Sequence, residues 1–118
     1  MGTPLVHSEM IVPDTEKARD FYGKVFDWVF DDTTFPGYTL IHTGRDTHGG
    51  LMTKHLEPTV PGLNSYFEVD DVKRTLHDVV EFGGRVVVPR TAIADVGEFA
   101  MFQDPEGIAV GILHPVRH

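Results

Sequence analysis

An internal repeat places the strongest constraint on how this 118-residue chain can fold. When the sequence is shifted against itself by about 57 residues, features recur in the same order. Ser8 then aligns with Ser65, Val12 with Val69 and Asp14 with Asp71. Each half reads as a strand, a helix and three further strands. The sequence therefore predicts one domain, 1–118, built from repeat halves at about 1–58 and 59–118.

The first half begins with a predicted strand over residues 5–12. Asp14 follows it and is a good helix N-cap, because its carboxylate can accept from amides of the first turn. Apolar residues then recur at helical spacing and form one stripe, which consists of Ala18, Phe21, Tyr22, Val25 and Phe26. Further strands are predicted over 27–32, 38–43 and 50–54.

The second half repeats this order, with a strand over 65–69 and a helix capped by Asp71. The inward residues of that helix are Val72, Leu76, Val79 and Val80, and Gly83-Gly84 ends it. Strands follow over 85–89, 98–103 and 108–114. The predicted class is α+β, with two βαβββ modules forming a curved eight-stranded mixed sheet around a cup-shaped cleft.

Composition excludes several classes of partner and site. Lys and Arg number 10 against 18 Asp and Glu, a net charge of −8 that disfavours nucleic acid and anionic membranes. The chain has no cysteine, which rules out disulfides and zinc–thiolate sites. It also shows neither a secretory pattern nor an apolar run of about 20 residues. We therefore expect a cytoplasmic protein.

The motif order resembles the vicinal oxygen chelate superfamily, which includes glyoxalase I, bleomycin-resistance proteins and extradiol dioxygenases. The resemblance rests on a first strand carrying His7, the Asp14 cap, the Phe21-Tyr22 pair and the turn Asp104-Pro105-Glu106-Gly107 before the last strand. It implies paired βαβββ modules around a U-shaped cavity that holds a divalent metal. It also implies a homodimer for a chain of this length.

The resemblance further implies metal ligands on the first, fifth and eighth strands, and often on the fourth. His7 matches the first position, but Asn64 and Gly111 stand at the fifth-strand and eighth-strand positions. The fourth falls near Leu51 or Met52. Because a lone imidazole does not hold a divalent ion, we expect no cofactor at the usual site. A rearranged divalent-metal site, His7 and Glu9 with His42 or Glu68, remains the alternative.

Strand alternation places His7 and Glu9 on one sheet face and Tyr66 and Glu68 on the equivalent face of the second half. The candidate ligand-binding residues are His7, Glu9, His42, Asn64, Tyr66, Glu68, Phe99 and Met101. Glu9 is the candidate for proton transfer, although each of these residues also has an ordinary structural interpretation, such as a salt bridge or core packing.

Three functions remain open from the sequence. The leading hypothesis is a homodimeric small-molecule-binding protein similar to the bleomycin-resistance proteins and lacking the usual metal. The alternative is a metal-dependent lyase, isomerase or dioxygenase with a rearranged site at His7. A dimeric interaction domain without a small ligand is the third. Whether the chain is an enzyme stays undecided at this point.

Overall fold

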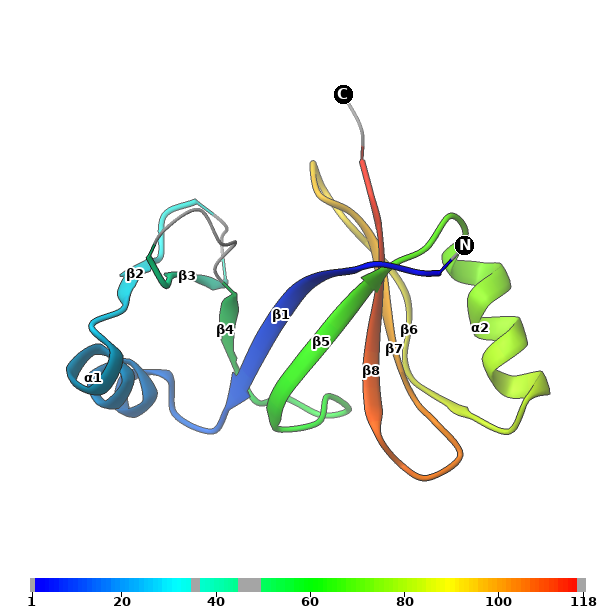
Figure 1. Cartoon of the computed structure of the whole chain (residues 1–118), viewed down its shortest axis with the longest axis horizontal. Helices are drawn as coiled ribbons and strands as arrows, with labels where there is room; N and C mark the ends of the chain where they lie inside the picture. Colours follow the sequence, from blue (N-terminus) through cyan, green and yellow to red (C-terminus); the bar gives the residue numbers. More distant parts are fainter. Residues whose placement is uncertain (1, 35–36, 45–49, 117–118) are drawn as a thin grey trace. The chain divides into compact units, whose positions relative to one another are not determined.

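The computed structural model describes residues 2–34, 37–44 and 50–116 (Figure 1). The chain divides into two compact units. The first unit is His7–Asn64, and the second combines the residues up to Val6 with the chain from Ser65 onward. The helices of the described residues include none that is long and apolar enough to cross a membrane.

The first unit contains most of the first strand and one helix with three short strands. These elements are β1 (Leu5–Val12), α1 (Thr15–Phe26), β2 (Val29–Asp31), β3 (Thr39–His42) and β4 (Leu51–Lys54). The strand order is β2-β3-β4-β1, with β1 parallel to β4 and the other pairs antiparallel. Asp14 caps α1 as predicted, since its Oδ1 accepts from the amides of Glu16 and Lys17 at 3.0 and 3.1 Å.

The second unit repeats this arrangement. Its elements are most of β5 (Gly62–Glu68), α2 (Val72–Glu81), β6 (Arg85–Ile93), β7 (Gly97–Gln103) and β8 (Ala109–Pro115). The strand order is β5-β8-β7-β6, with β5 parallel to β8. In both units the first strand therefore pairs in parallel with the fourth. The predicted α+β class, with two βαβββ modules and eight strands of mixed direction, is confirmed.

Helix α2 covers one face of its sheet, and Figure 1 shows it alongside the strands of the second unit. Val72 of α2 packs with Ala100 of β7 and Ile112 of β8, and all three are at most 3% exposed. Leu76 and Phe102 pack against this cluster. Burial of these apolar side chains is the main source of stability here, because each removes its surface from water.

Helix α1 differs, because none of its residues is buried. The predicted apolar stripe forms, yet Phe21, Val25 and Phe26 keep 57%, 55% and 54% of their surface exposed. The strands of this unit explain the difference. β2 has three residues and β3 and β4 have four each, too short a surface to cover the whole stripe.

Three predicted strands differ from the observed ones by at least two residues at one end, and one of them is β5, which begins at Gly62 and not at Ser65. β2 begins only at Val29, because Asp27 adopts a left-handed backbone (φ 57°) and donates its N–H to the Gly23 carbonyl at the end of α1. β6 continues past Pro89 to Ile93. Its register against β7 shifts between Val88 and Thr91, and such an irregularity accommodates a proline that cannot donate to the ladder.

Candidate functional site

The sheet of the first unit has one face that α1 does not cover. Gly23 of α1 lies against Phe30, which pairs with Ile41 on β3, so α1 packs on the face that holds these two side chains. Leu40, which precedes Ile41, points to the opposite face. It pairs with Leu51, and Leu51 pairs with Glu9. Glu9 therefore lies on the face turned away from α1.

His7 shares this face with Glu9, because the two residues are separated by two positions on β1. Glu9 is only 7% exposed and is the one carboxylate among the buried residues of the described chain. A buried carboxylate is costly unless it is hydrogen-bonded or paired. Its burial on the face away from the helix makes Glu9 the central candidate of this unit.

Tyr38 also belongs to this site. The sequence indicated it as an aromatic residue that could line the cleft, although core or interface packing was the favoured interpretation. Burial raises the pKa of the Tyr38 phenol above its usual 10.0, and the negative charge of Glu9 raises this pKa further. The phenol is consequently neutral at pH 7 and can donate a hydrogen bond close to an acceptor carboxylate. Alternation along residues 38, 40 and 42 was the available signal, since it places Tyr38 and Leu40 on the same side.

The other two candidates of the first unit lie differently. His42 is exposed at the end of β3, with β4 lying between its strand and β1. Asn64 is 4% exposed, and its Nδ2 donates to the carbonyls of Val60 and Gly62 at 3.1 and 3.2 Å. These two bonds give Asn64 a structural role in closing the loop that enters β5.

The sheet of the second unit also has a face turned away from its helix. Tyr66 pairs with Gly111, and Gly111 pairs with Met101, so these three positions form one row across β5, β8 and β7. Phe99 lies two residues from Met101 on the same face, and its ring centroid is 6.4 Å from that of Tyr66. Ala100 and Ile112, which contact α2, occupy the opposite face.

The Tyr66 ring lies directly over Gly111. A Cβ atom added at Gly111 would lie 2.6 Å from Cδ2 and Cε2 of Tyr66 and 2.8 Å from its Cγ. Distances this short leave no room for any side chain unless the ring moves. The aromatic ring thus fills the space into which a side chain at position 111 would extend.

These observations bear on the metal that the family resemblance implies. Position 111 offers no donor atom and its side-chain space is filled, and the amide nitrogen of Asn64 is bonded to backbone carbonyls. Leu51 and Met52 lie at the fourth-strand position. A divalent ion needs about three or more protein ligands, and the residues at these positions do not fit one.

Side-chain donors do gather elsewhere, on the surface of α2. Within the described residues, His77, Asp78 and Glu81 form the group of three potential ligands whose atoms lie within 4.8 Å of one another. All three are exposed and come from a single helix, as expected for a solvated helical surface. His7, Glu9 and His42 do not assemble into such a group.

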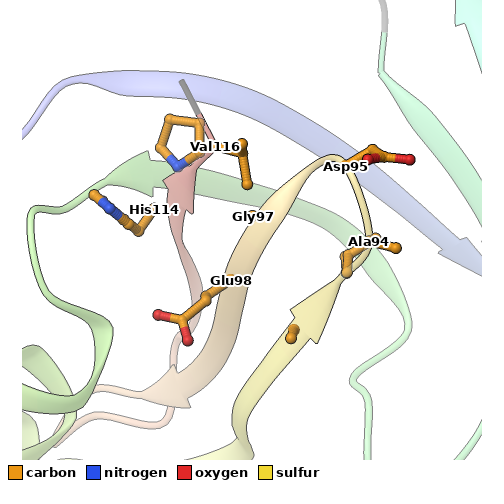
Figure 2. A pocket seen from close by; sticks show the side chains of 9 residues that line it. Ala94, Asp95, Gly97, Glu98, His114 and Val116 are labelled. Carbon is orange, nitrogen blue, oxygen red and sulfur yellow. The ribbon is translucent and has the colours of Figure 1, made fainter. Parts of the chain in front are cut away.

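Two surface cavities lie within the second unit. The first, about 540 Å³, is formed by the β6–β7 turn and the end of β8 (Figure 2). Glu98 and His114 pair across β7 and β8 at its wall, and Glu98 also lies 3.5 Å from Arg90. The second, about 440 Å³, places Glu68 near Asp70 and Arg74. Of the sequence-based candidates, only Glu68 lines either cavity.

Comparison with known proteins decides the family. The sequence model of the Glyoxalase/Bleomycin resistance protein/Dioxygenase superfamily matches residues 5–112. The chain belongs to this superfamily. The match covers nearly the whole chain, so both βαβββ modules of the glyoxalase/bleomycin-resistance fold are included.

Individual relatives agree with this superfamily assignment. A glyoxylase-like domain-containing protein of Didymella fabae is 30% identical over 107 residues, which are 84% of each chain. The protein CFP32 of Mycobacterium bovis is 33% identical over 113 residues, 89% of this chain. Those residues are 43% of CFP32, so this chain spans less than half the length of that relative.

Solved structures of the glyoxalase/bleomycin-resistance fold superimpose on this one. Methylmalonyl-CoA epimerase from Mycobacterium tuberculosis has a TM-score of 0.62 at 15% identity, covering 96% of this chain and 88% of the epimerase. An extradiol ring-cleaving dioxygenase from B. fuscum has a TM-score of 0.65 at 20% identity, covering 98% and 33%. At these identities the likeness establishes the fold alone.

Proposed function

We propose that this chain is a small-molecule-binding member of the superfamily that works without the usual divalent metal. The observation that carries the proposal is the Tyr66 ring over Gly111, because it fills the space of an eighth-strand ligand. The bonded amide of Asn64 supports it. His7 is then the one family ligand position with a metal-binding side chain.

The ligand contacts are proposed on the two sheet faces turned away from the helices. In the first unit, Glu9 of β1 supplies a hydrogen-bond acceptor, and Tyr38, just before β3, supplies a neutral donor. His7 of β1 and His42 of β3 are the other proposed contacts of this unit. In the second unit the proposed contacts are Tyr66, Glu68, Phe99 and Met101. Asn64 acts indirectly, by fixing the loop before β5.

Each of the two faces favours its own kind of ligand group. Tyr66 and Phe99 offer aromatic surfaces, which suit a planar, partly aromatic molecule. On the face of the first unit, Glu9 repels anions and accepts hydrogen bonds, so a neutral or cationic ligand with a hydroxyl or N–H group fits better there. On the face of the second unit, Glu68 likewise repels anions. We further propose that the protein acts as a homodimer in the cytoplasm.

Metal dependence is the sharpest test of this function. We expect untagged protein to contain no stoichiometric transition metal by elemental analysis. Its melting temperature should also stay constant when EDTA, Zn²⁺, Mn²⁺ or Ni²⁺ is added. A metal that bound the folded state would raise the melting temperature, and EDTA would lower it again. His7→Ala should leave both results unchanged, as should His77→Ala on the exposed surface of α2.

A contrary result would be a bound metal that His7→Ala removes and His77→Ala retains. Ligand binding is tested separately, with phenol and indole as probes. We expect amide NMR shifts in β1 and β3 that weaken in Glu9→Gln. Probe shifts that are unchanged by Glu9→Gln would contradict the proposed role of Glu9.

A further inference from the structure

The cavity between the β6–β7 turn and the end of β8 has no role in the proposed ligand site. Its volume is about 540 Å³, within the range of about 300–1,000 Å³ that is usual for sites of small ligands. Apolar side chains supply most of its lining, and they are Ala92, Ile93, Ala94, Pro115 and Val116. Every lining residue belongs to the second unit, so the cavity is complete within that unit.

The cavity exists because the strands continue past the helix that covers them. Ala100 of β7 and Ile112 of β8 pack against Val72 of α2. Glu98 and His114 lie two residues away on the same strands, so they occupy the same face in the next row. Figure 1 shows the β6–β7 turn and the end of β8 projecting beyond α2. The sheet face that α2 covers elsewhere is therefore open at this row.

Glu98 and His114 form the polar wall of the cavity. They are direct cross-strand partners, which places their Cβ atoms about 4.5–5.5 Å apart. Gly97 allows the two strands to approach closely, since a Cβ atom added there would clash with the His114 carbonyl oxygen. Figure 2 shows both side chains on one side of β7 and β8, whereas Asp95 points away from them. The carboxylate and the imidazole can therefore contact one ligand together.

A hydrogen bond orients the His114 ring and fixes its tautomer. The Nδ1 atom of His114 lies 3.0 Å from the carbonyl oxygen of Val69. A carbonyl oxygen can only accept, so Nδ1 carries the proton and donates to Val69. In the neutral ring Nε2 then has a lone pair and is an acceptor. Among the described residues, none donates a hydrogen bond to this Nε2 atom.

The Glu98 carboxylate also has an oxygen that can accept further hydrogen bonds. Its Oε2 is 3.5 Å from Nη1 of Arg90, longer than the about 2.7–2.9 Å of a charge-assisted hydrogen bond. This ion pair lies at the surface, where such pairs contribute little. Within the part of the chain that the structure describes, no group donates to Oε1 of Glu98. Oε1 is therefore left for a donor other than Arg90.

We propose that this cavity binds a small organic amine, whose ammonium group donates to Glu98 and His114 while its apolar body lies on the alanine, proline and valine side chains. Two neighbouring acceptors suit a ligand with several N–H donors, which a protonated primary amine has. The charge of Glu98 and the chain charge of −8 favour a cation over an anion. All contacts lie in the second unit, so the site is independent of the metal-free function proposed above.

A matched set of three probes tests the class of ligand. Phenylethylamine is the cationic probe, 2-phenylethanol its uncharged analogue and phenylacetate an anionic one. Each is titrated into the full chain at about pH 8, where imidazole is neutral, and amide NMR shifts are followed. We expect phenylethylamine to shift the amides of residues 92–98 and 114–116, with a dissociation constant of about 1 mM or below. The other two probes should bind at least about fivefold more weakly, because neither offers a positive charge to Glu98.

Charge removal at the cavity wall tests the polar contacts. Glu98→Gln should weaken phenylethylamine binding about tenfold, because it removes the charge that the ammonium group contacts. Glu106→Gln is the matched control, since it makes the same change at an exposed residue of the turn between β7 and β8. It should leave the dissociation constant within about twofold. His114→Asn should weaken binding several-fold, because asparagine can still donate to Val69 but has no atom at the Nε2 position.

A steric variant separates binding in the cavity from attraction to surface charge. Ala92 pairs with Glu98 on β6 and lines the cavity, and its side chain is exposed. Ala92→Phe keeps both acceptors but fills the space beside them, so it should abolish phenylethylamine binding. Circular dichroism verifies that each variant is folded.

Several results would overturn the amine site. One is the absence of amide shifts at the β6–β7 turn at about 10 mM phenylethylamine, and another is equal binding of the three probes. Unchanged affinity in folded Glu98→Gln and Ala92→Phe would also overturn it. Shifts confined to β1 and β3 would assign the amine to the first unit and contradict the cavity. None of these results affects the metal tests of the proposed function.

Discussion

At the scale of single residues, Gly111 shows how a missing side chain can define a site. The ring of Tyr66 occupies the space that a side chain at Gly111 would need. The pair is therefore interdependent, because glycine accommodates the ring and the ring excludes other residues from this position. The consequence reaches function, since position 111 is the eighth-strand ligand position that the family resemblance implies.

This interdependence predicts that Gly111→Ala destabilises the protein by about 1–3 kcal/mol, through overpacking against Tyr66. Gly23→Ala is the matched control. Its new Cβ would lie 3.7 Å from Phe30, an ordinary contact, and alanine favours the helix by up to about 1 kcal/mol. Urea unfolding measures both changes. Tyr66→Leu should restore part of the stability lost in Gly111→Ala. A Gly111→Ala variant with an unchanged free energy of unfolding would show that the ring moves freely.

At the scale of elements, Asp32 links α1 to the short strands. Its carboxylate accepts from the Thr39 hydroxyl at 2.7 Å and from Arg19 Nη1 at 2.8 Å. The Thr39 hydroxyl, followed by the Arg19 guanidinium, holds the pKa of Asp32 below its usual 3.8. Because the ionised carboxylate is favoured in the folded state, this link stabilises the fold at neutral pH.

The sign of the shift gives a pH dependence. The contribution of Asp32 is complete above the unfolded pKa of 3.8 and is lost as the pH falls through the lowered folded value. We expect Thr39→Val to raise the pKa of Asp32 toward 3.8, so that acid unfolding begins at higher pH. NMR of the carboxyl groups measures the pKa of Asp32, and circular dichroism measures the pH at which acid unfolding begins.

Thr75→Val is the control for Thr39→Val, because the Thr75 hydroxyl donates to a backbone carbonyl, that of Asp71. An acid transition that Thr39→Val leaves at its wild-type pH would disprove the link.

At the scale of the whole molecule, net charge and buried apolar surface have opposite effects on the proposed homodimer. A charge of −8 on each copy makes association less favourable, while apolar surface that becomes buried at an interface favours it. Salt screens the first effect over a Debye length of about 10 Å at 0.1 M and does not weaken the second. The balance between them sets the dimer affinity.

We therefore predict that the homodimer tightens as NaCl rises from about 0.02 to about 0.3 M, with a several-fold fall in the dissociation constant. Sedimentation velocity measures the dissociation constant at both salt concentrations. A dimer that weakens with salt would instead indicate an interface held by ion pairs.

The sequence alone was sufficient for the class of fold and most elements, because their signals are local. The Asp14 and Asp71 caps, the strand alternation and the order of elements all depend on neighbouring residues, and each is present in the structure. The α1 stripe was also predictable as a pattern. Its exposure was not, since this depends on how much strand surface the rest of the unit provides.

The tertiary structure decided which residues the candidate residues contact. Only the β5–β8 pairing brings Tyr66 over Gly111, and these residues are far apart in the chain. Tyr38 likewise lies near Glu9 only because the fold brings together residues that are far apart in the chain. The Asn64 amide closes its loop only once the backbone around it has folded. A sequence pattern places a side chain on a face, whereas its neighbours on that face are set by strand pairing.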